Sequence, residues 1–417
     1  MADASPLTPK PSHVAAKFVY DYDAFADPEF SRDQFAKVER ILKEAPPVFW
    51  TPHNGGLWIF TSYSAVTRAT RDWETYSNIL VPKAMLAAFT AMLPKGAITP
   101  ANALPSGADG PEHTMYRVPL NPAFTPQVVA GKLKNIRSLA AELIERVRAK
   151  GKCEVIDDIS AILPVQMFLE MWGLPIEKAN EYRVLVDSIT GGSTHDFGKI
   201  ITNSQLLIGA FNDELIARRD NPRNDIISMM WALEIGGKPM TLELMQSYGL
   251  SLFLAGLETV RNAMALGARH LAMNPVLQEK VRGNPSLVPQ MTEELLRLYS
   301  FAAPPRVCAR DHEIEGATLK EGERIMLLLA AANRDPAQFE NPTEFNMDRE
   351  TGKLHLAFGA GAHRCLGMHL ARAELHIFYE ELLSRLPTFR LDPDHPSTYH
   401  GGHTSGPDNV NLLWNIS

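Results

Sequence analysis

The chain has 417 residues, of which 45% are hydrophobic and 21% are charged, a composition typical of a globular protein with a large core. Its 41 Lys and Arg residues against 48 Asp and Glu residues give a formal net charge of -7, which excludes an overall basic surface for nucleic acid. The three cysteines, Cys153, Cys308 and Cys365, are far apart and form neither a disulfide framework nor a CxxC metal site. We therefore expect a reducing, cytoplasmic compartment.

The N-terminal stretch "MADASPLTPKPSHVAAKF" is polar and rich in proline. It has no apolar run long enough for a signal peptide or a membrane anchor, so we expect a loose arm over residues 1–17 and no contact with a membrane. Neither an internal repeat nor a break in composition marks a boundary. We therefore expect a single domain over residues 1–417.

The pattern along the chain is mostly helical, with short strands. Aromatic and β-branched runs on either side of an Asn-Gly-Gly turn predict a hairpin over residues 48–63. Helical patterns follow at 161–175, 176–190 and 197–220, and Gly191-Gly192 separates the last two. A short strand is predicted after the Glu-Gly turn near residue 322. The fold class is therefore mainly α with small β-sheets.

The longest helical pattern runs from Thr241 to Asn274 and predicts one central helix. Thr241 can cap its start, and Pro275 follows its end. At 1.5 Å per residue it would span roughly 50 Å. Its middle is apolar on nearly all sides, which predicts burial. Glu258 and Thr259 nevertheless lie at this centre, directly after a glycine that weakens the helix.

The stretch "AFGAGAHRCLGMHLA" surrounds Cys365 with three glycines. Apolar residues at helical spacing follow, so Cys365 lies at or just before a helix N-terminus, where the macrodipole and free N–H groups favour a thiolate. Gly359 and Gly361 permit a tight turn, and Gly367 leaves room for a flat group close to the backbone. A lone cysteine is more often a buried small hydrophobe. The glycine spacing favours axial ligation of haem iron instead.

The motif "FGAGAHRCLG" resembles the haem-binding loop of the cytochrome P450 monooxygenases, in the form F-G-x-G-x-H-x-C-x-G. Three further motifs are similar to that family, in the same order along the chain: "HTMYR", "AGLETV" and the E-x-x-R pair in "EELLRLYS". The segments "NGGLWIF", "GLETVRN" and "LLWN" are most similar to the bacterial camphor-hydroxylase group. The resemblance covers essentially the whole chain.

The resemblance implies a triangular, single-domain cytochrome P450 fold. It implies a haem (heme b, iron protoporphyrin IX) buried between the long central helix and the helix after the cysteine loop, with Cys365 as the metal ligand. The residues that it implies around the haem are His113, Arg117, Ala255, Gly256, Arg306, Phe358, Gly359, His363, Cys365 and Gly367. Seen singly, the histidines and arginines of this set would be surface or capping residues. Two haem propionates need such charge-assisted donors.

The resemblance gives Glu258 and Thr259 a catalytic role. They would otherwise be a buried polar pair satisfied by the helix backbone. Activation of dioxygen needs protons in a dry pocket, and a hydroxyl with a nearby acid meets that need. Glu258 stands where the camphor-hydroxylase group has Asp.

Two other polar groups are assigned to folding. Glu294 and Arg297 have the spacing of a surface ion pair, but the resemblance implies a buried structural pair on the cysteine side. The family's third residue is expected in a P-x-R-F segment, where this chain has Glu344. A metal site is not expected at Asp109 and its neighbours, because a carboxylate before a helix is a common cap.

The resemblance also implies which segments surround the substrate. Residues 80–105 are apolar and broken by Pro and Gly, which suits either a core-packing loop or a mobile cap, with Gly191-Gly192 as a second hinge. The ketone-binding tyrosine of camphor hydroxylase is replaced near Ala101, so the pocket should be more apolar. The expected substrate-binding residues are Ala101, Leu254, Ala302 and Thr404. His403 is either a donor or a surface residue.

These features predict a monooxygenase that hydroxylates or epoxidises a small apolar cyclic substrate of terpenoid or norisoprenoid size with O2. The sequence contains no flavin, nicotinamide or iron–sulfur motif, so the electrons should come from a [2Fe-2S] ferredoxin with an NADH-dependent reductase. We expect a monomer. The alternatives are a peroxygenase or dehydratase of the same fold, which would not need the Glu258–Thr259 pair, and a non-catalytic haem sensor.

Overall fold

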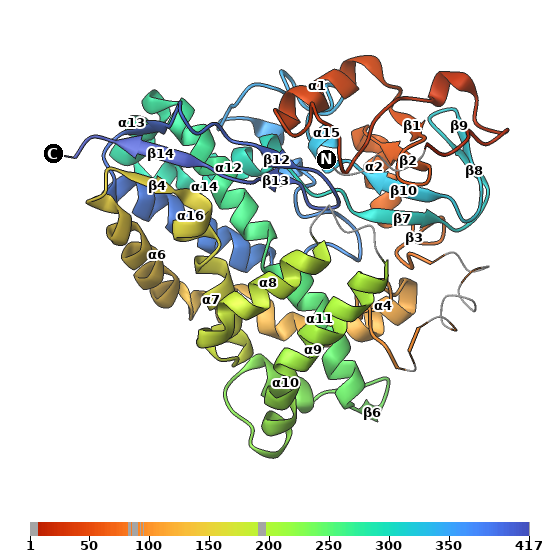
Figure 1. Ribbon diagram of the computed structural model, residues 1–417, viewed down its shortest axis with the longest axis horizontal. Helices are drawn as coiled ribbons and strands as arrows, with labels where there is room; N and C mark the ends of the chain where they lie inside the picture. The colour runs from red at the N-terminus through yellow and green to blue at the C-terminus, as the bar shows by residue number, and fades with distance from the viewer. Residues whose placement is uncertain are drawn as a thin grey trace.

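The structure is a computed structural model that describes residues 7–81, 85, 91, 93–94, 96–190 and 197–416. Helices make up most of it, and the strands gather beside them (Figure 1). The helices are α1 (Gln34–Glu44), α2 (Tyr63–Arg71), α4 (Gly110–Arg117), α5 (Pro126–Ala130), α6 (Leu133–Arg148), α7 (Leu163–Trp172), α8 (Ala179–Thr190), α9 (Phe197–Asp220), α10 (Ile226–Trp231), α11 (Leu242–Gly256), α12 (Thr259–Met273), α13 (Pro275–Gly283), α14 (Val288–Leu298), α15 (Leu329–Ala332) and α16 (Met368–Arg385).

The strands are short and fall into several small sheets. They are β1 (Val48–Thr51), β2 (Leu57–Phe60), β3 (Tyr76–Ser77), β4 (Lys152–Glu154), β5 (Glu234–Ile235), β6 (Lys238–Pro239), β7 (Pro305–Cys308), β8 (His312–Ile314), β9 (Ala317–Leu319), β10 (Arg324–Leu327), β11 (Phe389–Leu391), β12 (Tyr399–His400), β13 (Gly406–Pro407) and β14 (Asn411–Trp414). The predicted class, mainly α with small sheets, is confirmed.

The predicted hairpin is confirmed as the start of the largest sheet. β1 pairs antiparallel with β2, placing Trp50 opposite Trp58, and the strand order is β1-β2-β10-β7-β3. The turn between β1 and β2 uses Asn54, Gly55 and Gly56, all with positive φ. The part of the N-terminal arm that the structure describes is not loose, since Val14 is buried against this sheet's core.

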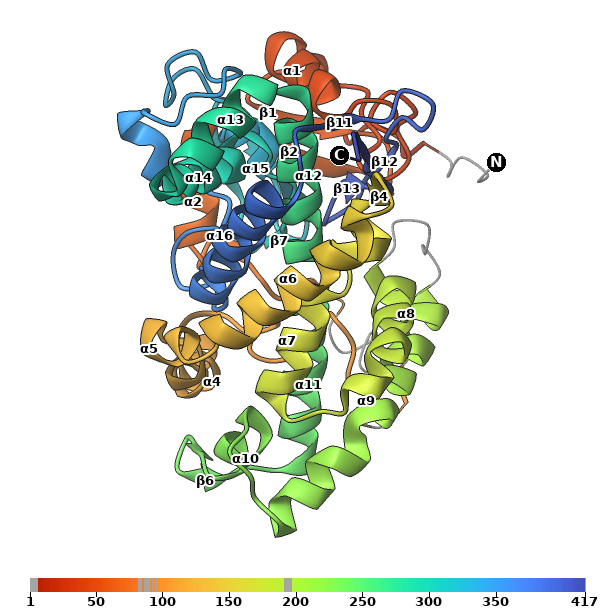
Figure 2. The same cartoon turned by 90° about the vertical axis from the view of Figure 1, so that its left-hand side faces the viewer.

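The helices α7, α8 and α9 lie within the three predicted ranges, whereas Gly191-Gly192 lies outside the described residues. Together with α10 and α11, these helices form one side of the molecule, where the short strand β6 lies beside α10 (Figure 2). Part of segment 80–105, the expected cap, also lies outside the described residues, namely 82–84, 86–90, 92 and 95.

The central helix differs from its prediction because it is interrupted. α11 ends at Gly256 and α12 begins at Thr259, with Leu257 and Glu258 between them. The Thr259 hydroxyl donates to the carbonyl oxygen of Ala255 at 3.0 Å, a side-chain bond that competes with the helix backbone. A hydrophobic pattern does not register such competition, so it predicted one continuous helix.

The helix α16 fixes α12 from the cysteine side of the molecule. The Tyr379 hydroxyl on α16 donates to the carbonyl oxygen of Ala263 on α12 at 3.0 Å. Gly267 gives Tyr379 its room, since a Cβ atom at Gly267 would lie 2.5 Å from the ring carbon Cζ. The two helices on either side of the candidate site are therefore held at a fixed distance.

A buried ion-pair group lies beside this contact. Arg297 is completely buried and makes two bonds of 2.8 Å to Glu294 on the same helix. Glu344 contributes only its backbone carbonyl, which accepts from Arg297 at 3.1 Å. The third residue is Arg349, whose Nε lies 3.4 Å from Glu294 Oε1. The group is thus complete, although its third member is not at the expected position.

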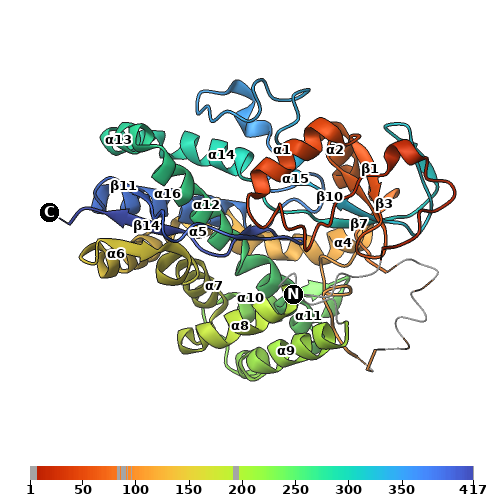
Figure 3. The same cartoon turned by 45° about the horizontal axis from the view of Figure 1, so that its top comes forward.

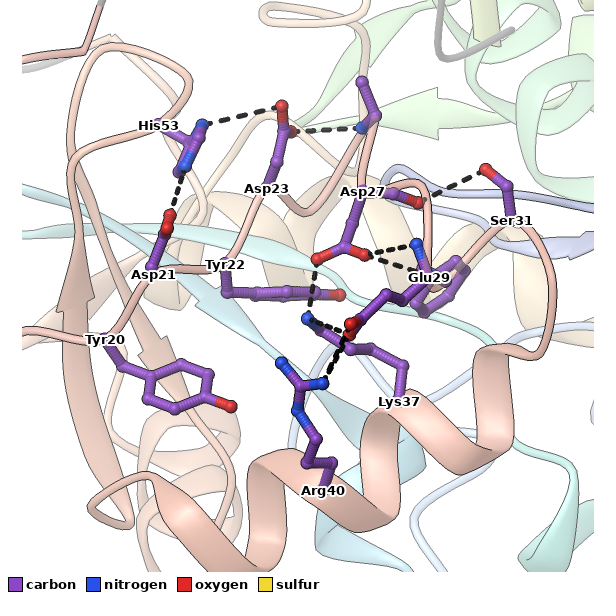
Figure 4. A network of polar contacts seen from close by, with 12 residues as sticks. Tyr20, Asp21, Tyr22, Asp23, Asp27, Glu29, Ser31, Lys37, Arg40 and His53 are labelled. Atoms are coloured by element: carbon purple, nitrogen blue, oxygen red, sulfur yellow. Dashed lines mark hydrogen bonds and ion pairs between the residues drawn. The ribbon is translucent and has the colours of Figure 1, made fainter.

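A second polar network ties the N-terminal segment to α1 (Figure 4). Lys37 on α1 is buried and lies 2.8 Å from Asp27 and 3.1 Å from Glu29. The N-terminal segment also binds the C-terminal loop around residues 399–402. Gly402 N donates to Ala24 O at 2.8 Å, and Tyr399 N donates to Ser31 O at 3.0 Å. The C-terminal strands lie alongside α12, in the middle of the molecule (Figure 3). None of the helices that the structure describes is long and apolar enough to cross a membrane.

We predict that Gly267→Ala destabilises the folded protein by about 1–3 kcal/mol, the usual range for overpacking. Its new methyl group would displace Tyr379 and push α12 from α16. Gly209→Ala is the matched control, since Gly209 is an exposed residue of α9 and nothing lies within 4 Å of its Cβ position. This substitution should stabilise the folded protein by about 0.5–1 kcal/mol. Urea unfolding of the holoenzyme measures both, and equal effects would contradict the prediction.

Candidate active site

The cysteine loop is built by close backbone packing. Gly359 and Gly361 have φ values of 66° and 70°, and a Cβ atom at Gly361 would collide with the carbonyl oxygen of Thr70. Cys365 N donates to Phe358 O at 2.9 Å, which closes the loop before α16. By contrast, nothing lies within 4 Å of the Cβ position of Gly359. The loop is thus packed tightly against Thr70 at Gly361, whereas its side at Gly359 is open.

Cys365 lines a cavity on this open side. Burial raises the pKa of its thiol, and the Gly367 N–H and the arginines at 117, 372 and 364 lower it only in part. The helix N-terminus therefore does not by itself give a thiolate at neutral pH. A coordinated metal ion deprotonates a thiol outright, so an iron bound here would supply the thiolate that the loop alone does not.

The cavity has a volume of about 570 Å³, within the usual range for a small-molecule site. The cysteine loop lies on one side, and the interruption between α11 and α12 lies on the other. It brings together most of the predicted residues: His113, Arg117, Leu254, Ala255, Gly256, Thr259, Ala302, Arg306, Phe358, Gly359, His363, Cys365, Gly367 and Thr404.

Two predicted residues are not among those that line it. Ala101 lies in a turn in which Asn102 N donates to Thr99 O, and its neighbours Pro100 and Ala103 line the cavity instead. Glu258 is buried behind the wall, 3.3 Å from Arg261 and 3.5 Å from His400. It is therefore adjacent to Thr259 in sequence but faces a separate charged network.

One end of the cavity carries buried nitrogen atoms without hydrogen-bond partners. The His113 and His363 rings lie 3.8 Å apart between centroids, and His113 Nδ1, His363 Nε2 and Arg306 Nε are buried with no hydrogen-bond partner. Burial lowers the pKa of Arg306 to about 10 and that of His363 to about 3. Buried polar atoms normally have partners. This cluster therefore fits an anionic group such as a carboxylate.

Asp109 does not complete a metal site with His113. It accepts from Asn78 N at 2.9 Å and makes no side-chain bond to the α4 N-terminus, so it is not the predicted cap. No metal-binding group of three or more His, Cys, Asp or Glu side chains occurs among the residues that the structure describes.

Several wall residues were not predicted from the sequence. Phe168 of α7 packs against Gly256, 3.0 Å from its Cβ position, and lines the cavity. Ser106 and Ser251 also line it and bond to each other at 2.8 Å. Within an apolar helix pattern, nothing distinguishes Phe168 from a core residue, so the sequence carried no usable signal for it.

Comparisons with known proteins agree with this geometry. The family model described as "Cytochrome P450" matches residues 207–401. A probable cytochrome P450 127A1 of Sinorhizobium fredii is 31% identical, with 97% of each chain covered. A steroid C26-monooxygenase of Mycobacterium tuberculosis is 32% identical over 88% of this chain and 90% of its own. The crystal structure of CYP101J2 is similar with a TM-score of 0.86, at 30% identity, covering 98% of this chain and 100% of that one.

An open face before a cysteine, a cluster of unpartnered donors and an apolar cavity are the features that a haem with two propionates requires. They agree with the full-length similarity in sequence and in structure. The chain therefore belongs to the cytochrome P450 family of haem-thiolate monooxygenases.

Proposed function

We propose that this monooxygenase hydroxylates or epoxidises a small hydrophobic cyclic substrate of terpenoid or norisoprenoid size. The observation that carries the proposal is the mainly apolar lining of the cavity beside Thr259, formed by residues such as Leu254, Phe301 and Ala302, which would be left to a substrate when the haem is bound at Cys365. The electrons come from a [2Fe-2S] ferredoxin with an NADH-dependent reductase. Arg364 is exposed beside the cysteine and suits an acidic partner, whereas Arg372 is already paired with Glu293 at 2.6 Å.

Cys365 holds the iron in this proposal, and the donors of His113, Arg117, Arg306 and His363 hold the propionates. Ala255, Gly256, Phe358, Gly359 and Gly367 border the ring faces. When bound, the haem supplies the activation of O2, which the thiolate ligand favours by electron donation. The protein's own part is to orient the substrate, exclude water and deliver protons.

Proton delivery falls to Thr259 and Glu258. The Thr259 hydroxyl lines the cavity and has its own proton engaged with Ala255 O, so its oxygen lone pairs remain free to accept. Glu258 lies in the interruption, where neither helix fixes its backbone fully. A rotation of its side chain would pass a proton from the charged network behind the wall to the cavity.

The polar groups of the wall offer few donors to a ketone. Burial lowers the pKa of His403, so its ring is neutral, and Nδ1 lies 3.2 Å from the Ala303 carbonyl oxygen, to which it donates. Its Nε2 is then an acceptor and has no proton for a carbonyl. The hydroxyls of Ser106 and Ser251 bond to each other, which uses the proton of one and leaves one donor in the pair. We propose that substrate orientation rests mainly on the apolar walls.

The first test concerns the ligand. We predict that Cys365→His abolishes the carbonyl absorption band of a thiolate-bound haem, because no other described cysteine faces the cavity. Cys153→Ser is the control, since Cys153 is buried in β4 and should not affect the band. Loss of the band in Cys153→Ser with retention in Cys365→His would refute the assignment.

The second test concerns proton delivery. We predict that Thr259→Ala continues to consume NADH but releases more hydrogen peroxide and less product, by roughly tenfold or more. Thr202→Ala is the matched control, because it removes the same kind of threonine bond to a carbonyl four residues earlier, at an exposed position outside the cavity. Unchanged coupling in Thr259→Ala would show that the hydroxyl is structural, and product formation without NADH would favour a peroxygenase.

The third test concerns the substrate. A missing hydrogen bond to a buried carbonyl costs about 1–3 kcal/mol, and each extra buried methylene gains about 0.8 kcal/mol. We therefore predict tighter spin-shift titrations with methylated rings of the ionone type than with camphor. Ala302→Leu, which narrows the wall, should reverse this order. Tight camphor binding without a shift from larger rings would contradict the proposal, and His403 would then be the first donor to test.

A further inference from the structure

Glu258 lies at the inner end of a row of charged side chains that leads to the surface. His400 Nε2 of β12 is 3.5 Å from Glu258 Oε1, and His400 Nδ1 is 2.8 Å from Asp408 Oδ1. The exposed fractions of the side chains rise outward, from 7% for Glu258 to 27% for His400 and 47% for Asp408. Thr398 fixes Asp408 by donating to its other oxygen at 2.7 Å.

Two cationic groups contact Glu258, and only one of them can release a proton. Arg261 Nη2 lies 3.3 Å from Glu258 Oε1, but a guanidinium keeps its proton at any physiological pH. Arg261 is also held by Asp187 of α8 at 3.6 Å. An imidazole changes its charge near neutral pH. His400 is therefore the group in contact with Glu258 that is suited to supply it with protons.

The charges around His400 support its protonated form. Glu258, Asp187 and Asp408 are three carboxylates against two guanidiniums, those of Arg261 and of Arg183, which lies 3.4 Å from Asp187. Burial by itself would lower the pKa of His400, but the contacts with Asp408 and Glu258 outweigh it and raise the pKa to about 9. The ring is thus charged at neutral pH and carries a proton beside Glu258, although it binds that proton more tightly than an ordinary histidine does.

We propose that His400 is a positioning residue that holds Glu258 and recharges it with protons from solvent through the Asp408 side. The proton on His400 Nε2 moves to Glu258 Oε1, after an approach of a few tenths of an ångström to normal hydrogen-bond distance. Asp408 holds the remaining Nδ1 proton, and a turn of the partly exposed ring exchanges its free nitrogen with water. This inference rests on the proposed proton roles of Glu258 and Thr259.

The charge-retaining variant separates proton transfer from simple ion pairing. His400→Arg keeps a positive charge beside Glu258 but cannot release a proton. His400→Gln removes both the positive charge and the transferable proton. We expect both to lower the ratio of product to NADH by about tenfold, less than the roughly hundredfold of losing a direct acid. His395→Gln is the control, since it removes an exposed histidine paired with Asp392 from the same C-terminal segment. Full coupling in His400→Arg would overturn the inference.

The pH profile gives a second readout. Because the pKa of His400 is raised, its proton is available below about pH 9 and is lost above it. Coupling in the unmodified enzyme should therefore fall as the pH rises through about 9, and this step should be absent from both His400 variants. An identical step in His400→Gln would assign it to another group.

A measurement without turnover completes the test. NMR titration of ring-labelled histidine in the ferrous-carbonyl holoenzyme should give His400 a midpoint near 9, and Asp408→Asn should move it toward about 6.5. An unshifted midpoint near 6.5 in the unmodified protein would refute the charged resting state. If Thr259→Ala fails to uncouple, the proposed proton role itself is wrong. If it uncouples while the His400 variants do not, only this inference fails.

Discussion

The interruption between α11 and α12 is the constraint on which the site depends. The Thr259 hydroxyl bonds to the Ala255 carbonyl, and the missing side chain of Gly256 admits Phe168. These two contacts lie at the break between α11 and α12. Here Thr259 lines the cavity, while Glu258 contacts Arg261 outside it. The two neighbouring residues thus lie on the apolar side and on the charged side of the same wall.

The cysteine side of the site requires rigidity, whereas the other side depends on an interrupted helix. Tyr379 locks α16 to α12 through the Ala263 carbonyl, and Arg297 connects α14 to backbone carbonyls at residues 333 and 342 while paired with Glu294. Breaking a buried ion pair of this kind by removing one partner typically costs about 3–5 kcal/mol. These contacts hold the cysteine loop in a fixed position relative to the cavity. A metal ligand needs such a fixed position more than a residue of the substrate wall does.

The sequence predicted the local features well, because their signals are local. The glycines around Cys365 and the Asn-Gly-Gly turn of the hairpin specify their own turns. The sequence prediction failed where the outcome depends on competition or on distance. Periodicity could not show that Thr259 would interrupt its helix, and the family's P-x-R-F pattern placed the third residue at Glu344, whereas Arg349 completes the ion-pair group. Likewise, no local pattern shows that His400 meets Glu258.

The electrostatic layout of the molecule follows from these placements. Arg306 Nε and His363 Nε2 lie without partners at the cysteine end, where an anionic group would accept hydrogen bonds from them. Carboxylates gather behind Thr259, where they favour a proton on His400. Between the two lies an apolar cavity in which unscreened charge would be costly. In the proposed relay, protons arrive from behind the wall, so the cavity need not admit water to supply them and is free to select substrates by shape.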